Sequence, residues 1–334
     1  MSHRLKVVVG VAISAALLAW LLASVDLREL GRQVARTDWS WVAVAVVVGL
    51  AGVYARAFRW RWLFPPGPPP PGIVAATMIG YMGNNVLPLR AGEIVRIYAA
   101  ARRLRDAERL SGTQAFWLVA STLVIERVLD SLVIVLMLAV LVFFIPVPAA
   151  VEWGAGILFV IDVVGVAFLV TVARAPHLGR RLVVRLTRRW PAAERTALAL
   201  FDTALRGLDG IRTPAHAARV AAWTLAVWLL PASAAWAMLR AVHLDLPFIA
   251  GWVVLAFVGL SISVPSAPGY VGVFHAAATA ALAVFGVPRE VGLAYALLYH
   301  ASALVPITVV GWIYLLREHL SLGEARQAPT EVTP

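Results

Sequence analysis

Residues 80–96 of the chain read GYMGNNVLPLRAGEIVR, and they interrupt a sequence that is otherwise strongly apolar. The stretch carries two adjacent amides and three charged side chains: Asn84, Asn85, Arg90, Glu93 and Arg96. A charged side chain at the centre of a bilayer costs about 2.5–3.5 kcal/mol, so such residues face a cavity or one another. Backbone broken by proline and glycine inside a membrane likewise needs protein or water around it. The stretch therefore predicts a polar site within the membrane, enclosed by the rest of the chain.

The composition predicts a polytopic membrane protein. Of the 334 residues, 61% are hydrophobic and 14% charged, and the mean hydropathy is +0.83, whereas soluble domains carry about 25% charged residues. The net charge of +11 comes almost wholly from arginine, which indicates cytoplasmic loops in contact with anionic lipid rather than a nucleic-acid partner. The absence of cysteine excludes disulfides and thiolate metal sites within this chain.

The hydropathy pattern divides the chain into long and short membrane segments. About six stretches are long enough to span a bilayer as helices, at 5–25, 39–58, 111–144, 152–172, 215–239 and 288–316. A signal peptide is the alternative for the first, although no small-residue cleavage pattern follows it. Two shorter segments, 72–87 and 247–264, run into prolines and glycines, and short helices follow at 91–101 and 273–285. We predict an all-α polytopic membrane protein with about six full transmembrane helices and two re-entrant or broken helix pairs.

A basic stretch at 173–213 fixes the predicted topology. Its arginines alternate with leucine and valine at helical spacing, which gives one basic and one apolar face. We expect a cytoplasmic amphipathic helical loop that lies on anionic lipid head groups, with a pair of partner-binding helices as the alternative. The positive-inside rule then places both termini in the cytoplasm, and the two broken pairs enter from opposite faces as an inverted repeat. The predicted domains are one transmembrane domain at 1–320 and a disordered tail at 321–334.

Three charges interrupt the long apolar stretch 111–144. Glu126, Arg127 and Asp130 are spaced so that they lie on neighbouring ridges of one helix. They are expected to contribute to the polar site, and a self-neutralising salt bridge is the alternative. Asp162 stands alone in the next apolar stretch, where a polar contact between helices explains it equally well.

The second helix break reads SVPSAPGYVG at residues 263–272 and contains Pro268 and Gly269. His275 follows directly, and His300 lies within the last predicted span. A histidine can be neutral near pH 7, so these two residues bear on substrate charge or on proton coupling.

Three motifs together resemble a known family. NNVLPLRAGEIVR at 84–96, ERVLD at 126–130 and SAPGYVGVFHAA at 266–277 resemble the transmembrane domain of lysylphosphatidylglycerol synthases, which also occurs as stand-alone proteins. The resemblance implies a lipid-translocating or lipid-handling protein of a prokaryotic inner membrane. Only a short tail follows Arg317, so the soluble aminoacyl-transferase domain and its reaction are expected to be absent. The chain departs from the family pattern at Tyr270, His275 and His300, where a glycine, an acid and an arginine are more usual.

We expect a flippase that passes the polar head of a phospholipid or lipid-linked amphiphile through a polar cavity. Arg90 and Arg96 suit phosphate, because arginine binds it bidentately and stays charged. The candidate substrate-binding residues are Asn84, Asn85, Arg90, Glu93, Arg96, Glu126, Arg127, Asp130, Pro268, Gly269, His275 and His300. A structural charge network that fixes helix register is the alternative for these residues.

Two other classes of function stay open. Glu126 and Asp130 could serve a membrane-embedded transferase or hydrolase, but no DxD, HExxH or GxSxG motif or histidine cluster accompanies them. An enzyme is therefore the less favoured reading, and we expect no cofactor and no metal. The third class is an accessory subunit that presents lipid to a separate lipid-modifying enzyme; homo-oligomerisation is open as well.

Overall fold

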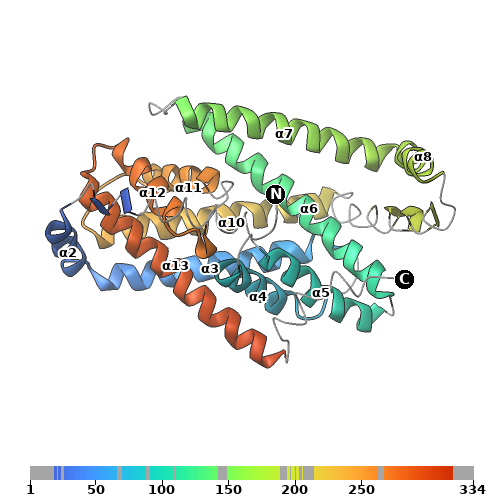
Figure 1. Cartoon of the computed structure of the whole chain (residues 1–334), viewed down its shortest axis with the longest axis horizontal. Coiled ribbons are helices and arrows are strands. Elements are labelled where there is room, and N and C mark those ends of the chain that lie inside the picture. The colour runs from blue at the N-terminus through green and yellow to red at the C-terminus, as the bar shows by residue number, and fades with distance from the viewer. Residues whose placement is uncertain are drawn as a thin grey trace.

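The computed structural model contains helices and no strands within the residues that it describes, which confirms the predicted all-α class (Figure 1). The described residues are 19–20, 22–23, 26–65, 70–87, 91–108, 110–141, 149–188, 194–195, 197–199, 201–202, 205, 214–261 and 267–318. Most of the first predicted span and the whole predicted tail at 321–334 lie outside them.

Among the described residues, three helices are both long and apolar enough to cross a membrane: α3 (Trp39–Arg61), α10 (Pro214–Ala241) and α13 (Arg289–Arg317). Even α3, the shortest at 23 residues, reaches about 35 Å, against about 30 Å of hydrocarbon. The chain is thus a multi-pass membrane protein. Two further helices, α6 (Gly112–Leu141) and α7 (Ala149–Arg174), match predicted spans in length, and α6 carries its charges midway.

The first short helix pair is α4 (Ile73–Val86) and α5 (Gly92–Glu108). With 14 residues, α4 is about 21 Å long, too short to span the hydrocarbon. Glycines bring the two backbones together, because a Cβ at Gly92 would lie 2.1 Å from the Gly80 carbonyl oxygen and one at Gly80 would lie 2.6 Å from the Arg96 Cβ. The sequence predicted a short helix at 91–101, but α5 is longer and continues through the arginine-rich residues 102–105 to Glu108.

The second short pair consists of α11 (Ile249–Ser261) and α12 (Val273–Ala283), with the 3-10 turn η3 (Pro268–Tyr270) before α12. Gly269, Tyr270 and Gly272 have φ values of 69°, 60° and 83°, in the left-handed region that favours glycine. A Cβ at Gly269 would lie 3.4 Å from the carbonyl oxygen of Asn85. The turn of the second pair therefore lies against the end of α4.

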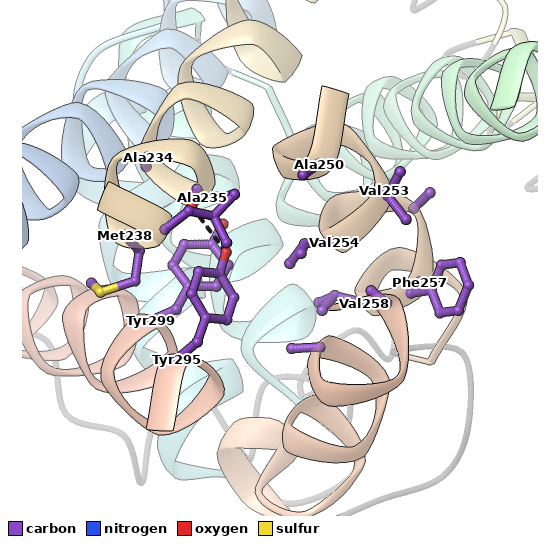
Figure 2. Packing of buried hydrophobic residues seen from close by; sticks show 14 of the residues in the cluster. Ala234, Ala235, Met238, Ala250, Val253, Val254, Phe257, Val258, Tyr295 and Tyr299 are labelled. Carbon is purple, nitrogen blue, oxygen red and sulfur yellow. Dashed lines mark hydrogen bonds between the residues drawn. The ribbon is translucent and has the colours of Figure 1, made fainter. Parts of the chain in front are cut away.

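The apolar core joins α10, α11 and α13 (Figure 2). Small residues on α10, including Ala234 and Ala235, meet valines of α11 and the ring of Tyr295 from α13. The Tyr295 hydroxyl donates to the Ala235 carbonyl at 3.0 Å, so its one polar atom is paired inside the core.

Two amphipathic helices lie toward opposite ends of the long axis, α2 (Leu27–Ala35) and α8 (Pro176–Thr187) (Figure 1). On α8 the leucines at 178, 182 and 186 are exposed, and Arg180 pairs with Asp202 at 2.8 Å. This helix falls in the predicted basic loop 173–213, much of which lies outside the described residues.

Candidate functional site

Glu126 of α6 is the centre of a network of ion pairs. Its two carboxylate oxygens each accept a hydrogen bond of 2.9 Å from the guanidinium of Arg96 on α5. Arg127 donates to the same carboxylate at 2.7 Å, and Arg59 Nη2 of α3 approaches it to 3.8 Å. Three arginines thus surround one carboxylate, in a geometry that includes a bidentate pair.

Asp130, one turn further along α6, binds two arginines of α3. Arg59 Nη1 donates to Asp130 Oδ1 at 2.7 Å, and Arg56 Nη1 donates to Oδ2 at 2.9 Å. The i, i+4 spacing of Glu126 and Asp130 places both carboxylates on one face of α6. The network therefore ties α3 and α5 to the middle of α6.

The network has a buried back layer and a more exposed front layer. The side chains of Arg59 and Glu126 are 0% exposed and that of Arg96 is 2% exposed, and Arg96 also lies 3.9 Å above the ring of Trp60. In the front layer, Arg127 is 43% exposed and Glu93 is 31% exposed, and they approach to 3.8 Å. Only the front layer is accessible to a ligand.

A cavity of about 440 Å³ opens in front of this layer. Its lining comes from α3, α4, α5, α6, α7, α10, α11 and η3: Arg56, Tyr81, Asn84, Asn85, Glu93, Arg127, Val128, Asp130, Ser131, Ile134, Ile161, Asp162, Gly165, Trp228, Gly259 and Tyr270. Guanidinium carries five N–H donors, and Arg56 and Arg127 use few of them on carboxylates. The remaining donors suit an anionic oxygen group such as phosphate.

The structure brings most residues of the first two motifs together. Asn84, Asn85, Glu93, Arg127 and Asp130 line the cavity, whereas Arg96 and Glu126 lie directly behind it in the back layer. The Oδ1 atom of Asn84 is buried without a hydrogen-bond partner, while Asn85 donates to Thr308 Oγ1 of α13 at 2.9 Å. Arg90 lies outside the described residues.

The third motif, at 266–277, lies beside this cavity, and of its described residues Tyr270 alone is part of the lining. Gly269 is buried, and His275 and His300 hydrogen-bond each other at 3.1 Å, Nε2 to Nδ1. Pro268 begins η3. The predicted residues Pro268, Gly269, His275 and His300 therefore form a neighbouring cluster that holds the turn before α12.

Sequence reasoning missed three charged residues of the site. Arginines beside tryptophans at the end of a span usually lie at the head groups, but Arg56 and Arg59 reach Asp130, and Arg59 is fully buried. Their i, i+3 spacing puts both guanidinium groups on one face of α3, as the i, i+4 spacing of Glu126 and Asp130 does for the two acids on α6, and this was the available signal. Asp162 lines the cavity from α7 and accepts a hydrogen bond from Ser131; nothing local separated it from an ordinary helix contact.

Comparisons with known proteins support a lipid-related membrane protein. The family model described as "Lysylphosphatidylglycerol synthase TM region" matches residues 7–311. Among curated proteins, the chain is similar to "Glycosyltransferase AglD" of Haloferax volcanii, with 25% identity over 371 aligned residues. That alignment covers 99% of this chain and 57% of the relative, so the chain spans little more than half of that protein. No solved structure matches the chain.

Proposed function

We infer the function from one premise: the chain belongs to the family of the lysylphosphatidylglycerol synthase transmembrane region. We propose that it is a flippase or lipid-handling transporter for a phospholipid or another lipid-linked amphiphile. The observation that carries this proposal is the cavity with Arg56 and Arg127 on its wall, backed by a buried ion-pair network. These two arginines bind the phosphate of the head group, and Asp130 and Glu126 hold them in place.

In this proposal the two short helix pairs are re-entrant and form an inverted repeat. The turn of the second pair meets the end of α4, where Gly269 approaches Asn85, and in this proposal each pair closes the cavity from its own side of the membrane. The head group passes through the polar cavity while its acyl chains stay in lipid. Discontinuous helices that meet near the midplane are typical of alternating-access transporters.

The proposed location is a prokaryotic inner membrane with both termini in the cytoplasm. Arginines gather at one end of the molecule, where Arg61 and Arg219 both lie over Trp62, within 5.0 Å and 4.7 Å of the ring centre. The basic helix α8 contacts anionic lipid there through its arginines and exposed leucines. A homo-oligomer or a partner lipid-modifying enzyme belongs to the same proposal.

Reconstitution in liposomes tests this function. The purified chain is reconstituted with head-group-labelled phospholipids, and loss of inner-leaflet protection is followed with and without a proton gradient. Arg127→Ala removes the proposed charge-assisted hydrogen bonds to the head-group phosphate, worth about 1.5–3 kcal/mol each, so we expect translocation to slow about 10-fold or more. Arg90→Ala tests the predicted phosphate-binding arginine that lies outside the described residues. Arg105→Ala is the matched control, because Arg105 is 49% exposed and pairs only with Asp106 among described acids. Lipid that stays protected with the folded wild-type chain refutes the proposal.

A second candidate function follows from the archaeal relative, which is named a glycosyltransferase. In this alternative, the chain acts in a membrane-embedded transferase or as an accessory subunit that presents a lipid to a partner enzyme. Turnover of a lipid-linked substrate by the purified chain supports the transferase. Activity that appears only after a partner is added supports the accessory subunit.

A further inference from the structure

The charges around the cavity are unevenly distributed. On α3, α5 and α6, four guanidinium groups accompany three carboxylates, which leaves one positive charge in excess: Arg56, Arg59, Arg96 and Arg127 with Glu93, Glu126 and Asp130. The fourth carboxylate, Asp162, comes from α7 and lines the same cavity. The described site is therefore neutral as a whole but has a positive side and a negative side.

Asp162 lacks a cationic partner among the described residues. Its side chain belongs to a residue that is only 2% exposed, and its one hydrogen bond comes from the Ser131 hydroxyl. The second oxygen, Oδ2, is buried and has no hydrogen-bond partner, and no described arginine reaches ion-pair distance. A buried carboxylate left unpaired is costly, so a bound cation would stabilise the ionised form of Asp162.

The surroundings of Asp162 make it stand out on its helix. Neighbouring side chains of α7, such as Ile157 and Val160, are apolar and exposed. Among the described side chains of α7, Asp162 contributes the one carboxylate of the cavity lining. If this position only had to contact Ser131, a neutral polar side chain would serve and no charge would have to be buried.

We propose that the site selects a net-neutral head group that carries one phosphate and one ammonium, and that Asp162 binds the ammonium. This inference rests on the proposed function of the same cavity. The phosphate takes the surplus positive charge of Arg56 and Arg127, and the ammonium donates to the free oxygen of Asp162. An anionic head group without an ammonium would leave Asp162 unpaired and add a net negative charge to a buried site, which lowers its affinity.

Transport of matched lipids tests the selectivity. Phosphatidylethanolamine and phosphatidylglycerol with the same acyl-chain label keep their natural head groups, and chemical quenching of the outer leaflet reports their translocation in proteoliposomes. We expect the wild type to move the ethanolamine lipid at least about 10-fold faster, which corresponds to about 1.4 kcal/mol. Asp162→Asn should remove this preference by slowing the ethanolamine lipid alone, and Asp162→Glu should keep it. Asp106→Asn is the control, because Asp106 is 63% exposed near the end of α5.

A binding measurement separates this inference from the proposed function. The apparent Tm of the detergent-solubilised chain is measured with each unlabelled lipid, which also shows whether Asp162→Asn is folded. Stabilisation by phosphatidylethanolamine that Asp162→Asn loses supports the inference even if no lipid crosses the bilayer. Translocation of both lipids at equal rates, or an unchanged preference in Asp162→Asn, overturns the inference and leaves the transport function standing.

Discussion

Two helix breaks lie side by side in this molecule, and different chemistry stabilises them. Beside the first pair, α4 and α5, full charges meet: Glu126 and Asp130 hold arginines from two helices. At the turn of the second pair, between η3 and α12, hydrogen bonds join two histidine rings and backbone groups. The first break opens on a cavity, whereas the second is packed against α13.

The hydrogen bonds of the second break indicate which ring nitrogen carries the proton in each neutral histidine. The Gly272 N–H donates to His275 Nδ1 at 3.2 Å, so neutral His275 carries its proton on Nε2. That proton points to His300 Nδ1, 3.1 Å away, and His300 also hydrogen-bonds the Gly269 backbone. The His300 ring stacks on Phe274 with 4.4 Å between centroids. A chain of neutral groups thus runs from Gly272 to Gly269 across the left-handed turn.

The difference between the breaks reflects access to polar surroundings. Charged side chains suit the first break because the cavity can hold water or a head group beside them. At the second break, His275 is 4% exposed and His300 8% exposed, so a net charge there would be buried against apolar rings. Neutral hydrogen bonds satisfy the backbone at a smaller desolvation cost.

The largest expected effect is at the centre of the charged network. Glu126→Gln removes the carboxylate that holds Arg96 and Arg127 and leaves buried guanidinium groups uncompensated. We expect a loss of about 3–5 kcal/mol in the free energy of unfolding, seen as a strongly lowered Tm in detergent. Glu93→Gln is the control, because Glu93 is 31% exposed and reaches Arg127 only at 3.8 Å. Equal Tm values for the two variants would contradict the assignment of a back layer.

The next effect compares glycines at the two breaks. Gly92→Ala places a Cβ 2.1 Å from the Gly80 carbonyl oxygen and forces α4 and α5 apart, which should cost about 3 kcal/mol or more. Gly269→Ala meets a flexible leucine side chain at 2.8 Å and adds about 1–2 kcal/mol of left-handed strain. Thermal unfolding of both variants shows which one loses more stability. A smaller loss in Gly92→Ala than in Gly269→Ala would show that the first pair is loosely packed. Gly31→Ala, with open space around it, should be tolerated.

Acidification should destabilise the second break and spare the first. Protonation of either histidine brings two N–H donors face to face, so acid should break the hydrogen bonds of this turn and lower the Tm as the pH decreases. The double variant His275→Gln/His300→Phe should show a flatter Tm profile between pH 5 and 8. If the wild type and the double variant show the same dependence of Tm on pH, the histidine pair is not the cause of the acid sensitivity.

The smallest effect on stability is expected at the front of the charged network. Arg127 is 43% exposed, and exposed ion pairs contribute about 0–1 kcal/mol, so Arg127→Ala should lower stability by less than about 1 kcal/mol. Glu126 keeps its bidentate pair with Arg96 in that variant. Unfolding measured beside Glu126→Gln checks this expectation, and a comparable loss in both would place Arg127 in the back layer.

The sequence predicted much of the site because its signals are local. Polar residues and helix breakers within apolar stretches indicated both breaks, and the spacing of Glu126 and Asp130 placed their carboxylates on one helix face. Arg56 and Arg59 escaped because arginines next to tryptophans at the end of a span usually lie at the head groups. The joining of His275 to His300 escaped as well, since nothing near either residue identifies its partner.

Composition and hydropathy by themselves predicted a membrane protein of helical class and showed that α4 is too short to span the bilayer. These properties depend on the free energy of transferring each residue into lipid and on the length of each apolar segment. Only the tertiary structure decided which charges pair and which face the cavity. Arg56 and Asp130 are 74 positions apart and Arg96 and Glu126 are 30 apart. Contacts at such separations depend on how each helix is rotated and packed against its neighbours, which no local pattern encodes.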